Sequence, residues 1–159
     1  MSRVSERLRE AGFSLPPAPK AVGEYVPAVL AGDVIYTAGQ LPMLDGALLA
    51  AGTVPDAVTC EIANECAAQC ALNALAAAST VCDIDAFARV IKVVGYVASA
   101  AGFHEQPSVI NGASEVLLIA LGEAGRHARE AVGVAALPLG APVEVSLVLQ
   151  VGADVRLTS

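Results

Sequence analysis

Two charged side chains near the end of the chain are of the types that bind and transform a small carboxylate. Arg129 begins one β-like run, and Glu144 lies near the start of the next. A guanidinium group can grip a planar carboxylate through two parallel hydrogen bonds, and a carboxylate nearby can orient or deprotonate a water molecule. The alternative is a structural salt bridge, or two separate charges in solvent, which is the usual role of arginine and glutamate. Both interpretations stay open on residue type alone.

Four cysteines occur at positions 60, 66, 70 and 82. Cys66 and Cys70 are four residues apart and would share one face of a helix. No CxxC pair or HExxH motif accompanies them, and neither His104 nor His127 is close in sequence. Small buried thiols are common in protein cores. We therefore expect reduced structural cysteines, no metal site and no cofactor.

The sequence shows no other catalytic motif. Its glycines are scattered at turns and form no loop that could cradle a phosphate. Ser79, Ser99 and Ser108 have no nearby triad partners, and none of them sits in a nucleophile elbow. A serine hydrolase is therefore a poor interpretation.

The charge balance argues against a nucleic-acid partner. The net charge is −7, from 9 lysines and arginines against 16 acidic residues. Phosphate backbones are bound by clustered basic residues, yet the only local basic cluster is Arg126, His127 and Arg129. The chain also lacks tryptophan, so it has no obvious platform on which bases could stack. A pocket for one small anion remains compatible with this composition.

The sequence is apolar for a chain without a membrane span, since 55% of its residues are hydrophobic and only 16% are charged. The longest apolar region, residues 57–81, is interrupted by glutamate, asparagine and glutamine. We therefore expect no membrane partner, and we expect other subunits to cover part of the surface. The first residues lack the apolar core of a secretory signal, which favours a cytoplasmic location.

Apolar periodicity and turn residues predict an α-β-β-α-β-α-β-β order. The expected elements are a helix at 2–11, strands at 25–30 and 34–38, an exposed loop at 39–54, a helix at 57–79, a strand at 88–99, a helix at 106–126, and strands at 130–136 and 142–151. The Gly32-Asp33 pair predicts a hairpin between the first two strands. In the alanine-rich helix at 57–79, we expect Val58, Ile62, Cys66 and either Leu72 or Leu75 to form the buried stripe.

The last strand is the most informative for orientation, because its residues alternate. Odd positions from Val143 to Val151 are all apolar, whereas Glu144, Ser146 and Gln150 lie on the other face. Glu144 is therefore expected on the less apolar face, outside the main core. Val148 on that same face would be poorly covered in an isolated chain.

The predicted elements define an α+β fold, with a mostly antiparallel sheet and two main helices on one face. A chain of 159 residues fits one domain. We divide it into an N-terminal helical extension at 1–19 and a main domain at 20–159.

Three blocks of sequence together resemble the signature of the RidA (YjgF-like) family. They are Glu24-Tyr25-Val26, the run from Ile35 to Pro42 (IYTAGQLP), and the stretch from His127-Ala128-Arg129 through Leu137-Pro138 to Val143-Glu144-Val145. They occur in the family's order with similar spacing. The resemblance covers about residues 23–151.

The resemblance implies a chorismate-mutase-like subunit and a barrel-like homotrimer with three clefts between subunits. Active members of the family are deaminases that hydrolyse reactive 2-imino or 2-enamino acids to 2-keto acids and ammonia. An imine carbon is already electrophilic, so a site that holds the carboxylate and places a water is sufficient. The implied partner is a small carboxylate-bearing metabolite.

The resemblance also implies roles for individual residues. Arg129 matches the arginine that binds the substrate carboxylate, and Glu144 matches the acidic residue that positions the attacking water. Gly39 matches a backbone position in the pocket, where the missing side chain allows close approach. Tyr25 matches an aromatic residue at the cleft, and Asn111 matches a polar position near it.

Two residues depart from the family pattern. Ala38 stands where many active members have a serine, and Ala131 replaces a common cysteine. These changes, with the N-terminal extension, suggest a longer divergent branch whose substrate differs. A non-catalytic module that binds a small carboxylate in the same cleft is the main alternative function. An endoribonuclease, a label often attached to the family, is disfavoured by the acidic charge.

Overall fold

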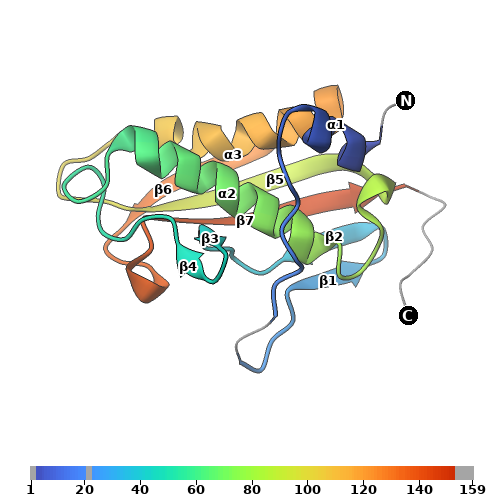
Figure 1. Cartoon of the computed structure of the whole chain (residues 1–159), viewed down its shortest axis with the longest axis horizontal. Helices are drawn as coiled ribbons and strands as arrows, with labels where there is room; N and C mark the ends of the chain where they lie inside the picture. The colour runs from blue at the N-terminus through green and yellow to red at the C-terminus, as the bar shows by residue number, and fades with distance from the viewer. Residues whose placement is uncertain (1–2, 21–22, 153–159) are drawn as a thin grey trace.

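A five-stranded sheet with two long helices on one face forms the body of the molecule (Figure 1). The computed structural model describes residues 3–20 and 23–152. The sheet has the spatial order β1-β2-β7-β5-β6, and every neighbouring pair is antiparallel except β5 and β6. Its strands are β1 (Ala28–Ala31), β2 (Val34–Thr37), β5 (Phe87–Ala98), β6 (Ala128–Val134) and β7 (Val143–Val151). The predicted α+β class is confirmed.

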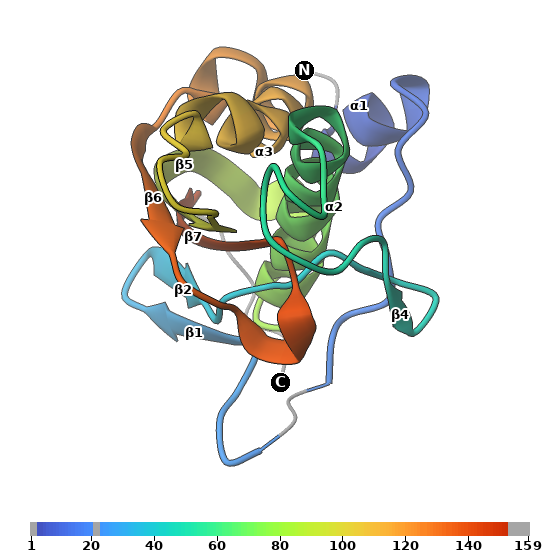
Figure 2. The same ribbon diagram turned by 90° about the vertical axis from the view of Figure 1, so that its left-hand side faces the viewer.

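Helices α2 (Cys60–Ala78) and α3 (Gln106–Leu121) cover the same face of the sheet (Figures 1 and 2). Thr59 caps α2 by accepting a hydrogen bond from the backbone N–H of Ile62 (3.3 Å). Gly122 ends α3, because its φ of 62° lies in the left-handed region that glycine adopts at low cost. This helix is therefore shorter than the predicted 106–126, and a 3₁₀ turn at Gly122–Gly125 follows it.

The core lies between the sheet and the two helices. The alternation predicted for β7 is confirmed, since its odd-numbered residues from Val143 to Val151 are buried and the even-numbered ones are partly exposed. The stripe predicted for α2 is wrong at Ile62, which is 43% exposed. The buried face runs instead through Ala63, Cys66 and Cys70, so Ile62, about 100° away from Ala63 around the helix, faces solvent.

The segments around the candidate site differ slightly from the predicted elements. Strand β1 begins only after Pro27, so Tyr25 lies in the loop that precedes it. Strand β6 begins at Ala128, which places Arg129 inside the strand. The predicted loop at 39–54 contains a small hairpin of β3 (Met43–Leu44) and β4 (Ala47–Leu48).

The N-terminal helix α1 (Val4–Glu10) packs against α3 and adds Val4 and Leu8 to the main core. The backbone N–H and the hydroxyl of Ser5 both donate hydrogen bonds to Asp85 (2.9 Å each). Beyond α1 the chain passes beside α2 before it reaches β1 (Figures 1 and 2).

The second face of the sheet is only partly covered and is rich in apolar side chains. Val29 and Tyr36 are in register on β1 and β2 and are each 51% exposed, and Val132 on β6 is 43% exposed. Lys92 and Glu130 form an ion pair on the same face (2.6 Å). None of the helices described is both long and apolar enough to cross a membrane.

Candidate functional site

Arg129 is held against helix α3 by two hydrogen bonds from the same nitrogen. Its Nη1 donates to Asn111 Oδ1 (2.8 Å) and to Ser114 Oγ (3.1 Å). Arg129 is in register with Val93, which is fully buried under the helices, so both side chains lie on the helix-covered face. Within the described residues, Nε and Nη2 make no hydrogen bond. These two nitrogens form one edge of the guanidinium, which is free to bind a carboxylate in bidentate fashion.

A chain of hydrogen bonds continues from Arg129 to the backbone. His127 Nδ1 lies 2.6 Å from the Gly125 carbonyl oxygen, which can only accept, so Nδ1 carries the proton. In the neutral ring Nε2 is then an acceptor, and the Ser114 hydroxyl, 3.0 Å away, donates to it. The Ser114 oxygen is thereby oriented to accept from Arg129. Ser114 and His127 therefore fix the position of the guanidinium.

Sequence reasoning did not identify Ser114 or His127 as site residues. His127 lies two positions before Arg129, just ahead of the first residue of β6, and Ser114 lies three after Asn111 on α3. Residues two apart on a strand, and three apart on a helix, share a face. The spacing of His127 from Arg129, and of Ser114 from Asn111, could therefore have indicated that both residues lie near the candidate site.

Glu144 lies on the opposite, open face of the sheet. It is in register with Tyr96 on β5, and its neighbours Val143 and Val145 are both fully buried under the helices. The carboxylate has no hydrogen-bond or ion-pair partner among the residues described. Partial burial raises the pKa of Glu144 above the ordinary value for a glutamate.

Gly39 lies directly against Glu144. A Cβ atom built on Gly39 would overlap Oε1 of that carboxylate, so any side chain at this position would displace it. The next residue, Gln40, pairs with Val145 through two backbone hydrogen bonds (2.8 and 3.0 Å). This pairing extends the contact between β2 and β7 and brings Gly39 to the carboxylate. Ala38 lies beside it, and its carbonyl accepts a hydrogen bond from Gln40 Nε2 (3.2 Å).

The structure therefore divides the predicted site into two groups. Arg129 and Asn111 are together on the helix-covered face, whereas Glu144 and Gly39 are together on the open face. Strand β5 separates β6 from β7, and the two groups point in opposite directions. One chain alone cannot bring Arg129 and Glu144 to the same ligand.

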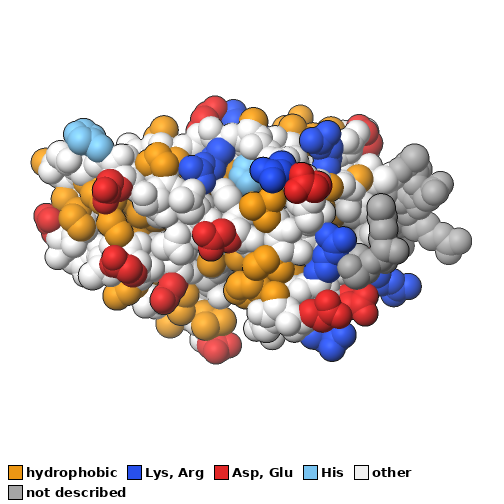
Figure 3. All heavy atoms as spheres, turned by 90° about the horizontal axis from the view of Figure 1, so that it is seen from above, with side chains coloured by type: hydrophobic (Ala, Val, Ile, Leu, Met, Phe, Trp, Pro, Cys, Tyr) orange, Lys and Arg blue, Asp and Glu red, His pale blue; other side chains and the backbone are white. Residues whose placement is uncertain are grey.

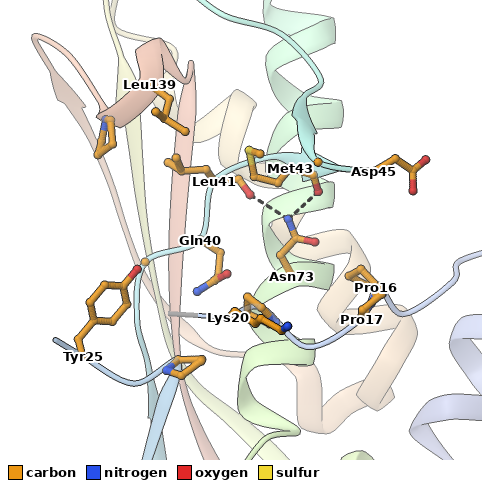
Figure 4. Close-up of a pocket in the computed structure, with 15 residues that line it drawn as sticks. Pro16, Pro17, Lys20, Tyr25, Gln40, Leu41, Met43, Asp45, Asn73 and Leu139 are labelled. Atoms are coloured by element: carbon orange, nitrogen blue, oxygen red, sulfur yellow. Dashed lines mark hydrogen bonds between the residues drawn. The ribbon is translucent and has the colours of Figure 1, made fainter. Parts of the chain in front are cut away.

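Tyr25 and Gly39 line a cavity with a volume of about 640 Å³ (Figure 4). One wall is the chain segment around Leu41 and Met43. Asn73 on α2 anchors this segment by donating to both carbonyl oxygens (2.9 Å each), as the dashed lines in Figure 4 show. Arg129 lines a different and smaller hollow of about 240 Å³ together with Ser114 and His127.

The cysteines do not form a site. Burial raises the pKa of Cys66 to about 11 and raises that of the fully buried Cys70 well above its usual range. Such thiols stay protonated at neutral pH and are poor nucleophiles and metal ligands. No group of three metal-ligating side chains occurs in residues 3–20 and 23–152.

The fold, a mostly antiparallel sheet covered on one face by two helices, places the chain among the chorismate-mutase-like α+β subunits. Comparison with known sequences identifies the family within that class. The family model described as "YjgF/chorismate_mutase-like, putative endoribonuclease" matches residues 5–151. The chain therefore belongs to the YjgF/RidA-like family, and the resemblance seen in its sequence blocks is confirmed.

Individual relatives agree with this assignment. "Protein TCP17" of Trypanosoma cruzi is 38% identical over 150 residues, which span 93% of this chain and 94% of that protein. The crystal structure of Atu1372 from Agrobacterium tumefaciens has a TM-score of 0.85 and 42% identity, covering 94% of this chain and 92% of its own. A structure named "putative endoribonuclease", from Shewanella oneidensis, has a TM-score of 0.88 and 29% identity, covering 94% of this chain and 100% of its own. RidA from an Antarctic Psychrobacter has a TM-score of 0.58 and 29% identity, with 84% and 94% coverage.

Proposed function

We propose that this protein hydrolyses reactive 2-imino or 2-enamino acids to 2-keto acids and ammonia, in clefts between the subunits of a homotrimer. The observation that carries the proposal is the pair of complementary half-sites. One is a clamped arginine with a free bidentate edge, and the other is an unpaired glutamate with a raised pKa against a glycine. Each chain carries both half-sites on opposite faces of its sheet. Only the half-site of a second copy of the chain can lie beside the other half-site to complete a cleft.

The open face of the sheet supports the assembly. The apolar side chains of Val29, Tyr36 and Val132 are exposed there to an extent that favours burial against another subunit. A cyclic assembly would place the Arg129 half-site of one subunit beside the open face of the next subunit, which carries Glu144. Three identical clefts, each with one Arg129 and one Glu144, follow from this arrangement.

The chemistry requires only binding, orientation and proton transfer. Arg129 binds the substrate carboxylate through Nε and Nη2, and Glu144 accepts a proton from a water molecule. The water oxygen forms a bond to the imine carbon while the electrons of the C=N π bond move to nitrogen. Protons then pass to that nitrogen, the tetrahedral adduct loses its hydroxyl proton, and ammonia leaves as the keto group forms. A raised pKa makes Glu144 a stronger base for the first step.

A non-catalytic module that binds a small carboxylate is the second candidate, because it would need only the Arg129 group. The two functions differ in what Glu144 does. In the proposed enzyme, Glu144→Gln lowers hydrolysis at least a hundredfold while carboxylate binding persists. In a binding module, no imine is hydrolysed in either form.

The face of the molecule shown in Figure 3 does not favour an RNA-cleaving function. On the face shown in Figure 3, lysine and arginine side chains are interspersed with aspartate and glutamate, without a continuous basic stripe. Arg126 forms an ion pair with Glu123 (2.8 Å). A small anionic ligand fits this charge distribution better than a polynucleotide does.

The direct test is a coupled assay in which an amino-acid oxidase generates 2-imino acids and their decay is followed with purified protein. We expect faster decay with the wild type and none above background with Arg129→Ala. Arg89→Ala is the matched control, since Arg89 is exposed on β5, outside both half-sites. Full activity in Arg129→Ala would overturn the assignment.

A further inference from the structure

The cavity beside Gly39 extends well beyond the residues that the proposed reaction needs. Its volume of about 640 Å³ lies in the range of small-molecule sites, which is far more than a methyl or hydroxymethyl group would fill. Gly39 belongs to both regions, because it lines this cavity and also contacts the Glu144 carboxylate. Gly39 is thus the residue that the cavity shares with the proposed reaction centre.

The walls of the cavity are mainly apolar (Figure 4). Five prolines, which have no N–H to donate, form much of the lining together with aliphatic and thioether side chains. These apolar residues are Pro16, Pro17, Pro19, Pro27, Leu41, Met43, Pro138 and Leu139. The polar Asn73 is already used, because its amide donates to two carbonyls and accepts from Gln69 (2.9 Å). A bound group would thus meet mainly hydrophobic surface.

Leu139 marks the rim of the cavity (Figure 4). It is 74% exposed and has a φ of 59°, which is rare for a residue with a side chain. Unusual backbone of this kind is often kept at ligand-binding sites. An apolar ligand that covered Leu139 would remove its side chain from water.

We propose that this cavity is the side-chain subsite of the enzyme and that it selects substrates with large apolar side chains, whether branched aliphatic, thioether or aromatic. The inference rests on the proposed function for its reaction, but the binding preference can be measured without turnover. It also assigns a role to the N-terminal segment, whose Pro16, Pro17, Pro19 and Lys20 form one wall. The extension at 1–19 would then determine specificity.

Two charged residues, Lys20 and Asp45, also line the cavity. The ammonium group of Lys20 forms no ion pair with any described residue. It could bind a distal acidic group, so the test must distinguish a dicarboxylic substrate from an apolar one.

The experiment compares 2-imino acids with side chains of increasing size, made in place by an oxidase. We expect kcat/KM to rise about fourfold for each methylene group that becomes buried, since each contributes about 0.8 kcal/mol. Met43→Trp, which fills the cavity, should lower the ratio of large-substrate to small-substrate kcat/KM at least tenfold. Leu44→Trp is the matched control, because Leu44 is 44% exposed and does not line the cavity. Leu41→Trp provides a second filling variant in case Met43→Trp does not fold.

Calorimetry with stable 2-keto acids separates failure of this inference from failure of the proposed function. Tighter binding of longer apolar keto acids, lost in Met43→Trp, would support the subsite even if no imine were hydrolysed. Equal affinity for all chain lengths would overturn it while leaving the reaction intact. A preference for dicarboxylic ligands that disappears in Lys20→Met would also overturn it, in favour of an anion-binding cavity.

Discussion

Arg129 and Glu144 lie on opposite faces of one sheet, because they are in register with residues of β5 that point in opposite directions. Arg129 is level with Val93, which is buried under the helices, and Glu144 is level with Tyr96 on the open face. The two side chains that the proposed reaction needs therefore point away from the sheet in opposite directions. Because of this arrangement, one can test whether the proposed hydrolysis requires the assembly of several subunits.

The first prediction is complementation between two inactive variants. Arg129→Ala and Glu144→Gln homotrimers should each be inactive, yet subunits unfolded together and refolded at equal amounts should recover about one quarter of wild-type activity. Random mixing gives both variants in about three quarters of the trimers, and each mixed trimer has one complete cleft of three. The measurement is imine decay after co-refolding, with separately refolded and then mixed variants as the control. No recovery in stable mixed trimers would place both residues in one subunit's site.

The second prediction concerns Gly39. A Cβ at this position would overlap the Glu144 carboxylate, so Gly39→Ala should displace it and lower kcat at least tenfold. The fold should survive, since the backbone at Gly39 is not in the left-handed region. Gly152→Ala is the control, because its Cβ would make only an ordinary contact with the Ala86 carbonyl (3.8 Å). An unchanged kcat in Gly39→Ala would show that the proposed reaction does not depend on the present position of the Glu144 carboxylate.

The third prediction concerns the chain from Arg129 through Ser114 to His127. Ser114→Ala removes the acceptor that holds the guanidinium, and a hydrogen bond to a charged group contributes about 1.5–3 kcal/mol. We expect KM to rise about tenfold with a smaller change in kcat, because in the proposed reaction Arg129 binds the carboxylate while Glu144 performs the proton transfer. Ser108→Ala, on the exposed first turn of α3, should change neither constant. A fall in kcat alone would assign Ser114 a role in the chemical step instead.

The fourth prediction is the pH dependence of activity and stability. Because burial raises the pKa of Glu144, kcat/KM should fall on acidification at a pH above the usual carboxyl range, where this base becomes protonated. The folded state disfavours the charged form of the Glu144 carboxylate, which lowers the free energy of unfolding. This loss of stability is absent below the pKa that Glu144 has in the unfolded chain, and it grows as pH rises through the higher pKa of the folded state. Glu144→Gln should therefore melt at a higher temperature than the wild type at neutral pH. Glu130→Gln, on the exposed edge strand, should show no such gain, and equal melting temperatures for all three would contradict the burial argument.

The elements of the fold were largely predictable from the sequence. The strict alternation in β7 identified its buried face, and the Gly32-Asp33 pair located the first hairpin. The error at Ile62 has a simple cause, because an alanine-rich helix has weak contrast between its faces and small residues can form the buried stripe. The end of α3 was also misjudged, since helix signals locate termini only approximately.

The sequence alone determined which residue types were available and, through the two-residue period of β7, that Glu144 lies outside the main core. It could not show that Arg129 faces α3, that Ser114 and His127 hold it, or that Gly39 touches Glu144. Those relationships depend on which strands are neighbours and in what register they pair, and long-range packing sets both. Periodicity reports the two faces of an element, but only the assembled sheet decides what each face meets. For this protein, the tertiary structure separated two residues that the sequence had suggested as partners and placed them on opposite faces of the sheet.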